Sequence, residues 1–187
     1  NPLLYPVNLN GNSLKEGNLQ YGGGSTWGWT QGTMMIPKDQ VVYFEMCRDG
    51  SSGRGYGGIA LQEHQTNTTG SRADGFIYGL ISSLGDDADW YFPTRTIAGA
   101  GSTSSISGNY MADIIGVVVD QANSTVKFYA SNTLRKTITN AAIFSTTGDY
   151  VPFAGGALNT ETIMNFGQDS SFAGNFTAQG NTDSNGI

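Results

Sequence analysis

Short stretches of apolar and β-branched residues, separated by turn-forming residues, recur along the whole chain. In 125–130 apolar and polar positions alternate, which places Val126 and Phe128 on one face of a strand and Lys127 and Tyr129 on the other. No segment shows the 3.6-residue period of an amphipathic helix over three turns. We therefore predict strands at 17–21, 41–47, 56–61, 75–81, 89–92, 114–120, 125–130, 150–154 and 162–167.

Many short strands with frequent turn signals predict an all-β fold, an antiparallel two-sheet β-sandwich with little or no helix. Residues 114–120 are almost continuously apolar, which is typical of a strand buried on both faces at the centre of such a sandwich. Gly116 within this strand lets a neighbouring backbone or ring approach closely. Gly116→Val is therefore expected to cost a few kcal/mol of stability through overpacking.

Glycine is unusually frequent, with 27 residues among 187, and this composition opposes long helices. The clusters at 22–24 and 53–58 are interpreted as turns and bulges, because glycine tolerates positive φ angles. They do not read as phosphate loops, since no Gly-Lys-Ser/Thr sequence follows either cluster.

The order of motifs from residue 33 to residue 172 resembles the SPRY domain. The residues that carry the likeness are Tyr-Phe-Glu-Met at 43–46, Tyr-Gly-Gly-Ile-Ala at 56–60, Asp-Ile-Ile-Gly-Val-Val-Val-Asp at 113–120, Tyr-Val-Pro-Phe at 150–153 and Asn-Phe-Gly-Gln at 165–168. The resemblance implies a concanavalin-like sandwich (a SPRY-like jelly roll). Within it we expect Asp120 to cap a tight turn and the amides of Asn165 and Gln168 to satisfy backbone groups where strands end.

A narrower resemblance concerns the first part of the chain. Asn-Pro-Leu-Leu at 1–4, Leu-Lys-Glu-Gly-Asn-Leu at 14–19 and Thr-Trp-Gly-Trp-Thr-Gln-Gly-Thr at 26–33 are similar to SPRY-type segments in structural and fibre proteins of tailed bacteriophages. Such segments are embedded in longer chains, which agrees with a first residue other than Met. The resemblance implies a virion location, with 1–32 as an N-terminal extension and first strands packing on the sandwich, 33–172 as the SPRY-like sandwich and 173–187 as a polar tail or linker.

Aromatic residues beside polar ones form the candidate binding surface. Trp27 and Trp29 alternate, so that both lie on one face of a local strand, and glycines flank Tyr56. Rings next to carboxylates and amides are typical of sugar-binding and peptide-binding surfaces. The alternative is that these rings fill the core or a subunit interface. The candidate residues are Trp27, Trp29, Arg54, Tyr56, Trp90 and Tyr91.

Catalytic and metal chemistry find little support in the sequence. His64 is the one histidine and Cys47 the one cysteine, and no Gly-x-Ser-x-Gly motif is present. A glycosidase would need a pair of carboxylates, and the spacing of Glu45, Glu63, Glu161 and the several Asp residues selects no such pair. We therefore expect no catalytic residues, no cofactor and no enzyme. The acidic turn with Asp86, Asp87 and Asp89 is a weak candidate for Ca²⁺, and a solvated turn is the favoured interpretation.

The net charge of −6 disfavours contact with nucleic acid or anionic lipid. Three functions remain open. The first is a virion display module of a fibre, spike or decoration protein, which docks to other virion subunits or copies of itself and contacts a host-surface glycan or protein. The second is a peptide-binding adaptor of the cellular SPRY kind, and the third a carbohydrate-active enzyme on the same scaffold. Membrane insertion is not expected, since no apolar run of about 18 residues occurs.

Overall fold

The fold is that of a computed structural model of the chain. It describes residues 5–8, 13–15, 20–22, 28–49, 54–61, 76–82, 88–90, 104–106, 114–139, 149–157, 159–172, 174 and 176–180. Every regular element in these ranges is a strand, which confirms the all-β prediction. The described residues include no helix long and apolar enough to cross a membrane.

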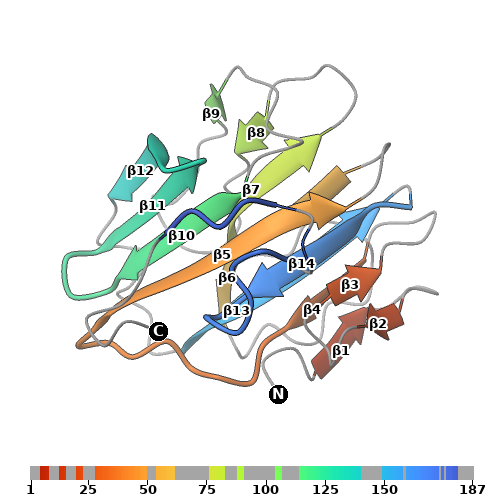
Figure 1. Cartoon of the computed structure of the whole chain (residues 1–187). Coiled ribbons are helices and arrows are strands. Elements are labelled where there is room, and N and C mark those ends of the chain that lie inside the picture. The colour runs from red at the N-terminus through yellow and green to blue at the C-terminus, as the bar shows by residue number, and fades with distance from the viewer. Residues whose placement is uncertain are drawn as a thin grey trace.

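The strands form two large antiparallel sheets and a small one (Figure 1). The five-stranded sheet has the order β1-β4-β13-β6-β7, with bounds Tyr5–Asn8, Gly28–Gln31, Tyr150–Ala157, Arg54–Leu61 and Phe76–Ser82. The seven-stranded sheet has the order β12-β11-β10-β5-β14-β3-β2, with bounds Thr133–Thr139, Thr125–Ala130, Ile115–Asp120, Val41–Asp49, Glu161–Asn165, Gln20–Gly22 and Ser13–Lys15. β8 and β9 pair separately, with bounds Ala88–Trp90 and Ser104–Ile106.

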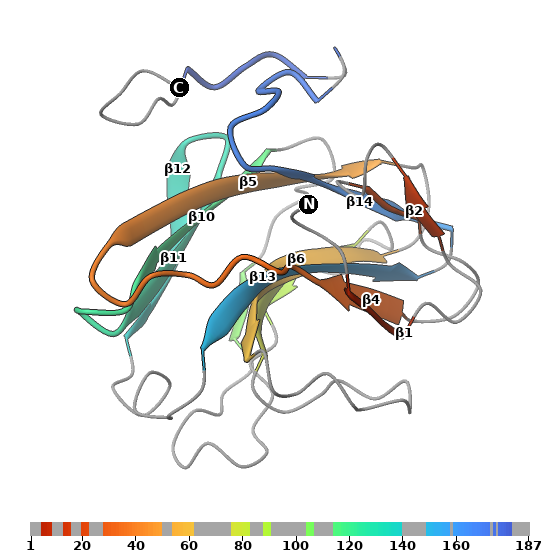
Figure 2. The same cartoon turned by 90° about the horizontal axis from the view of Figure 1, so that it is seen from below.

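The two large sheets pack face to face and enclose the core (Figure 2). Phe44, Val117 and Phe128 are cross-strand partners on β5, β10 and β11, and each is at most 1% exposed. The alternation predicted for 125–130 is confirmed, since Val126 and Phe128 are buried while Lys127 and Tyr129 are partly exposed. The same core cluster includes Ile59, Tyr150 and Ala154 of the five-stranded sheet.

The glycines at 54–58 lie within a regular strand, so their interpretation as turns and bulges is wrong. β6 runs from Arg54 to Leu61, and every one of its positions has a partner on β7 or β13. The physical reason is space rather than φ. A Cβ at Gly57 would collide with Met46 Sδ and lie 3.1 Å from the Phe153 carbonyl oxygen, so only a glycine lets the two sheets approach so closely here.

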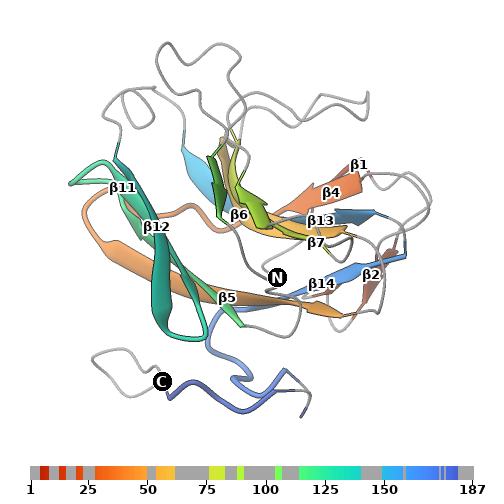
Figure 3. The same ribbon diagram turned by 90° about the horizontal axis from the view of Figure 1, so that it is seen from above.

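The last described segment covers part of the outer face of the seven-stranded sheet (Figures 2 and 3). Phe172 packs with Cys47 and Ile114, and its ring meets Phe176 edge-on at 5.7 Å between centroids. Gln179 Nε2 donates to the Ile114 carbonyl at 3.1 Å. β10 is therefore buried on its inner face and only in part on its outer face, where Val118 stays half-buried.

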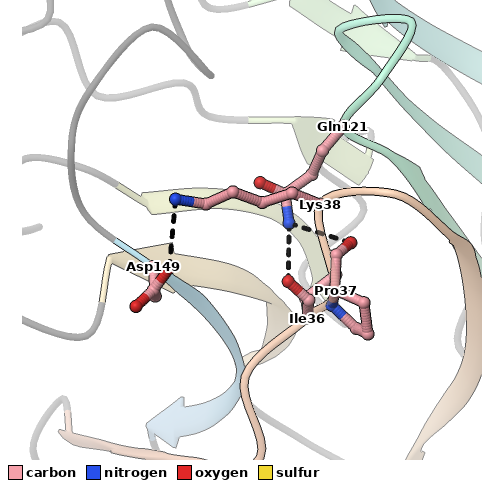
Figure 4. Close-up of polar contacts among 5 residues, drawn as sticks. All are labelled: Ile36, Pro37, Lys38, Gln121 and Asp149. Atoms are coloured by element: carbon pink, nitrogen blue, oxygen red, sulfur yellow. Dashed lines mark hydrogen bonds and ion pairs between the residues drawn. The ribbon is translucent and has the colours of Figure 1, made fainter.

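Residues 32–40 cross from the five-stranded sheet to the seven-stranded sheet and close one side of the core (Figure 4). Ile36 is 4% exposed, and its amide donates to the Tyr150 carbonyl at 2.8 Å. Gln121, which lies in the β10–β11 turn, donates from Nε2 to the Ile36 carbonyl at 2.7 Å. The ion pair of Lys38 with Asp149, 3.2 Å between charged atoms, is well exposed and therefore stabilises the crossing little.

Two hairpin turns show how side chains fix the ends of the central strands. Asp120 accepts hydrogen bonds from the Asn123 amide at 3.0 Å and from Asn123 Nδ2 at 2.7 Å, which confirms its predicted capping role. These two bonds hold the pKa of the Asp120 carboxyl below its ordinary value of 3.8. Between β11 and β12, Ser131 and Asn132 have φ angles of 44° and 63°, as a two-residue type I′ turn requires.

Candidate binding surfaces

The structure places four of the six candidate binding residues on strands. Trp29 lies in β4, Arg54 and Tyr56 lie in β6, and Trp90 ends β8. Only the backbone of these four is described. Trp27 and Tyr91 lie outside the described residues.

Strand register brings Trp29 and Tyr56 into one row of the five-stranded sheet. Trp29 pairs with Gly155 on β13, and Gly155 pairs with Tyr56 on β6. Because neighbouring strands are about 4.8 Å apart, the two aromatic positions are separated by roughly 10 Å, with a glycine between them. We call Trp29, Gly155 and Tyr56 the aromatic row.

The aromatic row belongs to the outer face of its sheet. The next row along the same strands consists of Thr30, Ala154 and Gly57, and Gly57 faces Met46 of the opposite sheet. Successive positions of a strand alternate between the two faces, so the aromatic row occupies the face directed away from the seven-stranded sheet, on which Val151 and Phe153 are fully buried. Arg54, two positions before Tyr56, shares this face.

The backbone at the centre of the aromatic row is held from the inside of the sandwich. The Thr162 hydroxyl on β14 donates to the Gly155 carbonyl at 2.7 Å, and this bond is buried. Gly155 was not singled out from the sequence. The adjacent Gly155-Gly156 pair within a strand is the signal that marks a place where another backbone or a ligand approaches closely.

The outer face of the seven-stranded sheet carries a second group of aromatic and polar side chains. The ring of Tyr43 lies over Gly116, where an added Cβ would be 2.9 Å from the ring, which confirms that a ring approaches this glycine. The Tyr43 hydroxyl donates to Glu45 Oε1 at 2.7 Å, and Asn165 Nδ2 donates to Glu45 Oε2 at 2.9 Å. Glu45 is only 4% exposed, so these bonds stabilise a buried carboxylate.

The Asn-Phe-Gly-Gln motif satisfies backbone groups at the end of β14, as expected from the sequence. Asn165 Oδ1 accepts from the amides of Gly167 at 3.0 Å and Asp169 at 3.2 Å. Gln168 Oε1 accepts from the Phe166 amide at 2.7 Å, and Gln168 Nε2 donates to the Met164 carbonyl at 3.0 Å. The motif therefore builds the turn from which the C-terminal segment crosses the sheet.

The residues considered for metal binding and catalysis are only partly within the described ranges. Asp86, Asp87 and His64 lie outside them, and of Asp89 only the backbone in β8 is described. Cys47 is fully buried against Ile114 and Phe172, so a substrate cannot reach its thiol. Within the described ranges no group of three or more His, Cys, Asp or Glu side chains is placed to hold a metal ion.

The fold is that of SPRY domains. The chain superposes on the SPRY domain of human HERC1 with a TM-score of 0.59 and 12% identity, over 84% of this chain and 94% of that one. The PSpry domain of TRIM65 gives a TM-score of 0.59 at 12% identity, over 90% and 93% of the two chains. Stonustoxin gives 0.57 at 12% identity, over 87% of this chain but only 28% of the toxin chain.

The sequence comparisons add no relative. No family model matches the chain, and no curated protein matches it. At 12% identity the structural likeness shows the fold alone, because one fold serves many functions.

Proposed function

We propose that this chain is a non-enzymatic protein-binding module, and that the aromatic row is its principal contact surface. The observation that carries the proposal is the register that sets Trp29 and Tyr56 on either side of Gly155. Gly155 itself is buried, so the partner is expected to contact the two aromatic side chains, about 10 Å apart, rather than the glycine backbone between them. Aromatic residues on rigid strands contribute large contact areas at low entropic cost.

The SPRY-like fold supports a role in binding rather than in catalysis. The strands that carry the aromatic row are hydrogen-bonded on both sides, so binding needs no rearrangement of the sheet. Arg54 on the same face supplies a cation for a carboxylate or a backbone carbonyl of the partner. A partner segment is thus bound by stacking on the row and oriented by one charged contact.

We further propose that the module is displayed on a virion, as part of a fibre, spike or decoration protein of a tailed bacteriophage. The support is the likeness of the segments at 1–4, 14–19 and 26–33 to such proteins, together with a glycine-rich, charge-poor composition. Many copies on one particle convert weak single contacts into avidity. Its partners are then neighbouring virion subunits and a host-surface protein or glycan.

The binding role is tested with the purified chain tetramerised on labelled streptavidin and host cells in flow cytometry. Trp29→Ala with Tyr56→Ala is expected to lower cell binding at least about tenfold, the effect of losing two aromatic anchors. Trp29→Phe with Tyr56→Phe keeps much of it. Tyr43→Ala is the matched control, because it removes an exposed tyrosine of the other sheet. Equal binding by all variants contradicts the aromatic row.

Two further readouts separate the partner classes and the location. Protease treatment of the cells abolishes binding to a protein, whereas periodate treatment abolishes binding to a glycan. If the module is displayed on the virion, immunogold labelling with antibodies against the chain is expected to decorate purified particles. Label found only on cell debris contradicts the virion location and leaves the binding role to be judged by the cell assay.

A further inference from the structure

Strand β12 forms one edge of the seven-stranded sheet and is its most exposed long strand. Within the described residues it pairs with β11 alone (Figure 1). Five of its seven residues are exposed and the other two are half-buried. An edge strand presents a row of backbone N–H and C=O groups to which a further strand can pair.

This edge is basic in an acidic protein. Residues 121–148 contain three of the nine Lys and Arg residues, namely Lys127, Arg135 and Lys136, and no Asp or Glu. The rest of the chain carries six Lys and Arg against 15 Asp and Glu. The β11–β12 hairpin therefore carries three cations and no carboxylate, and Asp120 of β10 adjoins it in the row of Thr125 and Thr139.

The cations lie on both faces of the edge. Lys127 is the partner of Thr137 in the outer row that contains Tyr43 and Val118. Lys136 is the partner of Phe128, in the inner row, because Phe128 belongs to the core. A strand added at this edge would direct alternate side chains to the two faces, and each face offers it a cation.

A bulge divides β12 into two parts. Lys136 pairs with Phe128 and Leu134 with Tyr129, which leaves Arg135 as the extra residue. Beyond the bulge Lys136–Thr139 pairs in unbroken register with β11. Leu134, 50% exposed, lies beside the bulge and offers an apolar contact. Lysines and bulges also protect edges against unwanted pairing, so a merely protected edge is the competing explanation.

We propose that β12 docks an extended acidic segment of a partner protein, which adds to the seven-stranded sheet as a further strand along Lys136–Thr139. Charge complementarity selects this occupant, because a basic edge attracts acidic segments and the negative remainder of the chain repels long polyanions. The inference goes beyond the proposed function, because it concerns the other sheet and a different class of contact. Backbone hydrogen bonds supply the pairing and the three cations supply the selectivity.

The test measures fluorescence anisotropy of a labelled, end-capped peptide of repeated Val-Glu-Glu with the whole chain. We expect saturable binding that Lys136→Glu weakens at least about tenfold. Lys38→Glu is the matched control, because it makes the same change in net charge at an exposed lysine of the segment 32–40, far along the chain from β12. It is expected to leave the dissociation constant within about twofold. Melting temperatures establish that both variants are folded.

Strand addition is separated from simple attraction by the backbone of the probe. A peptide of the same sequence with alternate N-methylated amides keeps its charge but cannot complete the ladder, and its binding is expected to be lost. In the unmodified chain the peptide is expected to slow amide exchange at Thr137–Thr139. Equal binding of the methylated peptide, equal binding of an oligothymidylate, or no binding at all overturns the proposal. Trp29→Ala with Tyr56→Ala is expected to leave peptide affinity unchanged, so the two surfaces are tested separately.

Discussion

Two glycines of the sandwich leave room for a side chain from another strand, one between the two sheets and one on the outer face of the seven-stranded sheet. At Gly57 the side chain is that of Met46, which is fully buried between the sheets. At Gly116 it is the ring of Tyr43, which is 40% exposed on the outer face. The same chemical device therefore closes the core in one place and shapes a surface in the other, and the cost of filling each gap depends on whether the neighbour can move into solvent.

The largest effect is expected for Gly57→Ala. The added methyl group collides with Met46 Sδ and crowds the Phe153 carbonyl, and neither group can move outward. The free energy of unfolding should fall by about 2 to 3 kcal/mol in urea denaturation. In a Met46→Ala background the same change should lose most of its cost, as neighbours in contact do in a double-mutant cycle.

Gly55→Ala provides the graded companion of that variant. Its Cβ would meet Thr162 Oγ1 at 2.8 Å, a hydroxyl that can rotate at the expense of its bond to Gly155. The expected cost is about 1 kcal/mol, that of one hydrogen bond. A Gly57→Ala variant no less stable than Gly55→Ala would contradict the close approach of the sheets at Met46.

The second effect concerns the polar side chains that hold the outer face together. Asn165→Ala removes the acceptor of two turn amides and one donor to the buried Glu45 carboxylate. We expect a loss of about 2 kcal/mol in the same denaturation experiment. Gln168→Ala removes two bonds from an exposed residue of the same turn and should cost less than half as much. Equal costs would show that burial of Glu45 does not govern the turn.

The residues of this comparison also show what the sequence could predict. Asn165, Asp120 and the alternation of β11 act locally, within a few positions along the chain, and their predicted roles are confirmed. That a ring would approach Gly116 was predictable, whereas its identity as Tyr43 depends on the pairing of β10 with β5 across more than 70 residues.

Non-local register limits the prediction of the candidate site in the same way. Trp29 and Tyr56 were candidates for their residue types, but the pairing with Gly155 that unites them lies about 100 residues further along the chain. β12 was missed because an edge strand needs no apolar face, and Arg135 and Lys136 interrupt the alternation by which strands are recognised. Its β-branched threonines and Ile138 were the remaining signal.

A smaller effect is expected for Gly116→Val, which sharpens the contrast with Gly57. The sequence predicted a cost of a few kcal/mol from overpacking of a core strand. Because the ring displaced is that of a surface residue, we now expect about 1 kcal/mol, chiefly the lost bond from Tyr43 to Glu45. Tyr43→Ala with Gly116→Val should be no less stable than Tyr43→Ala alone. A cost equal to that of Gly57→Ala would mean that the ring cannot swing into solvent.

The smallest effect is a pH dependence of stability at the turn that joins β10 to β11. The bonds from the Asn123 side chain and amide lower the pKa of Asp120 in the folded chain, so its ionised form stabilises folding above pH 3.8. This contribution is lost as the pH falls through the lowered pKa, because the protonated carboxyl accepts the bonds less well. Between pH 5 and pH 2 the melting temperature of Asp120→Asn should therefore fall less steeply than that of the unmodified chain. Asp39→Asn is the matched control, because Asp39 is an exposed carboxylate in the segment 32–40 that joins β4 to β5. If the melting temperatures of the unmodified chain and of Asp120→Asn fell in parallel with pH, the ionised Asp120 carboxyl would contribute no stability. The bonds from Asn123 would then fix the geometry of the turn without stabilising the folded chain.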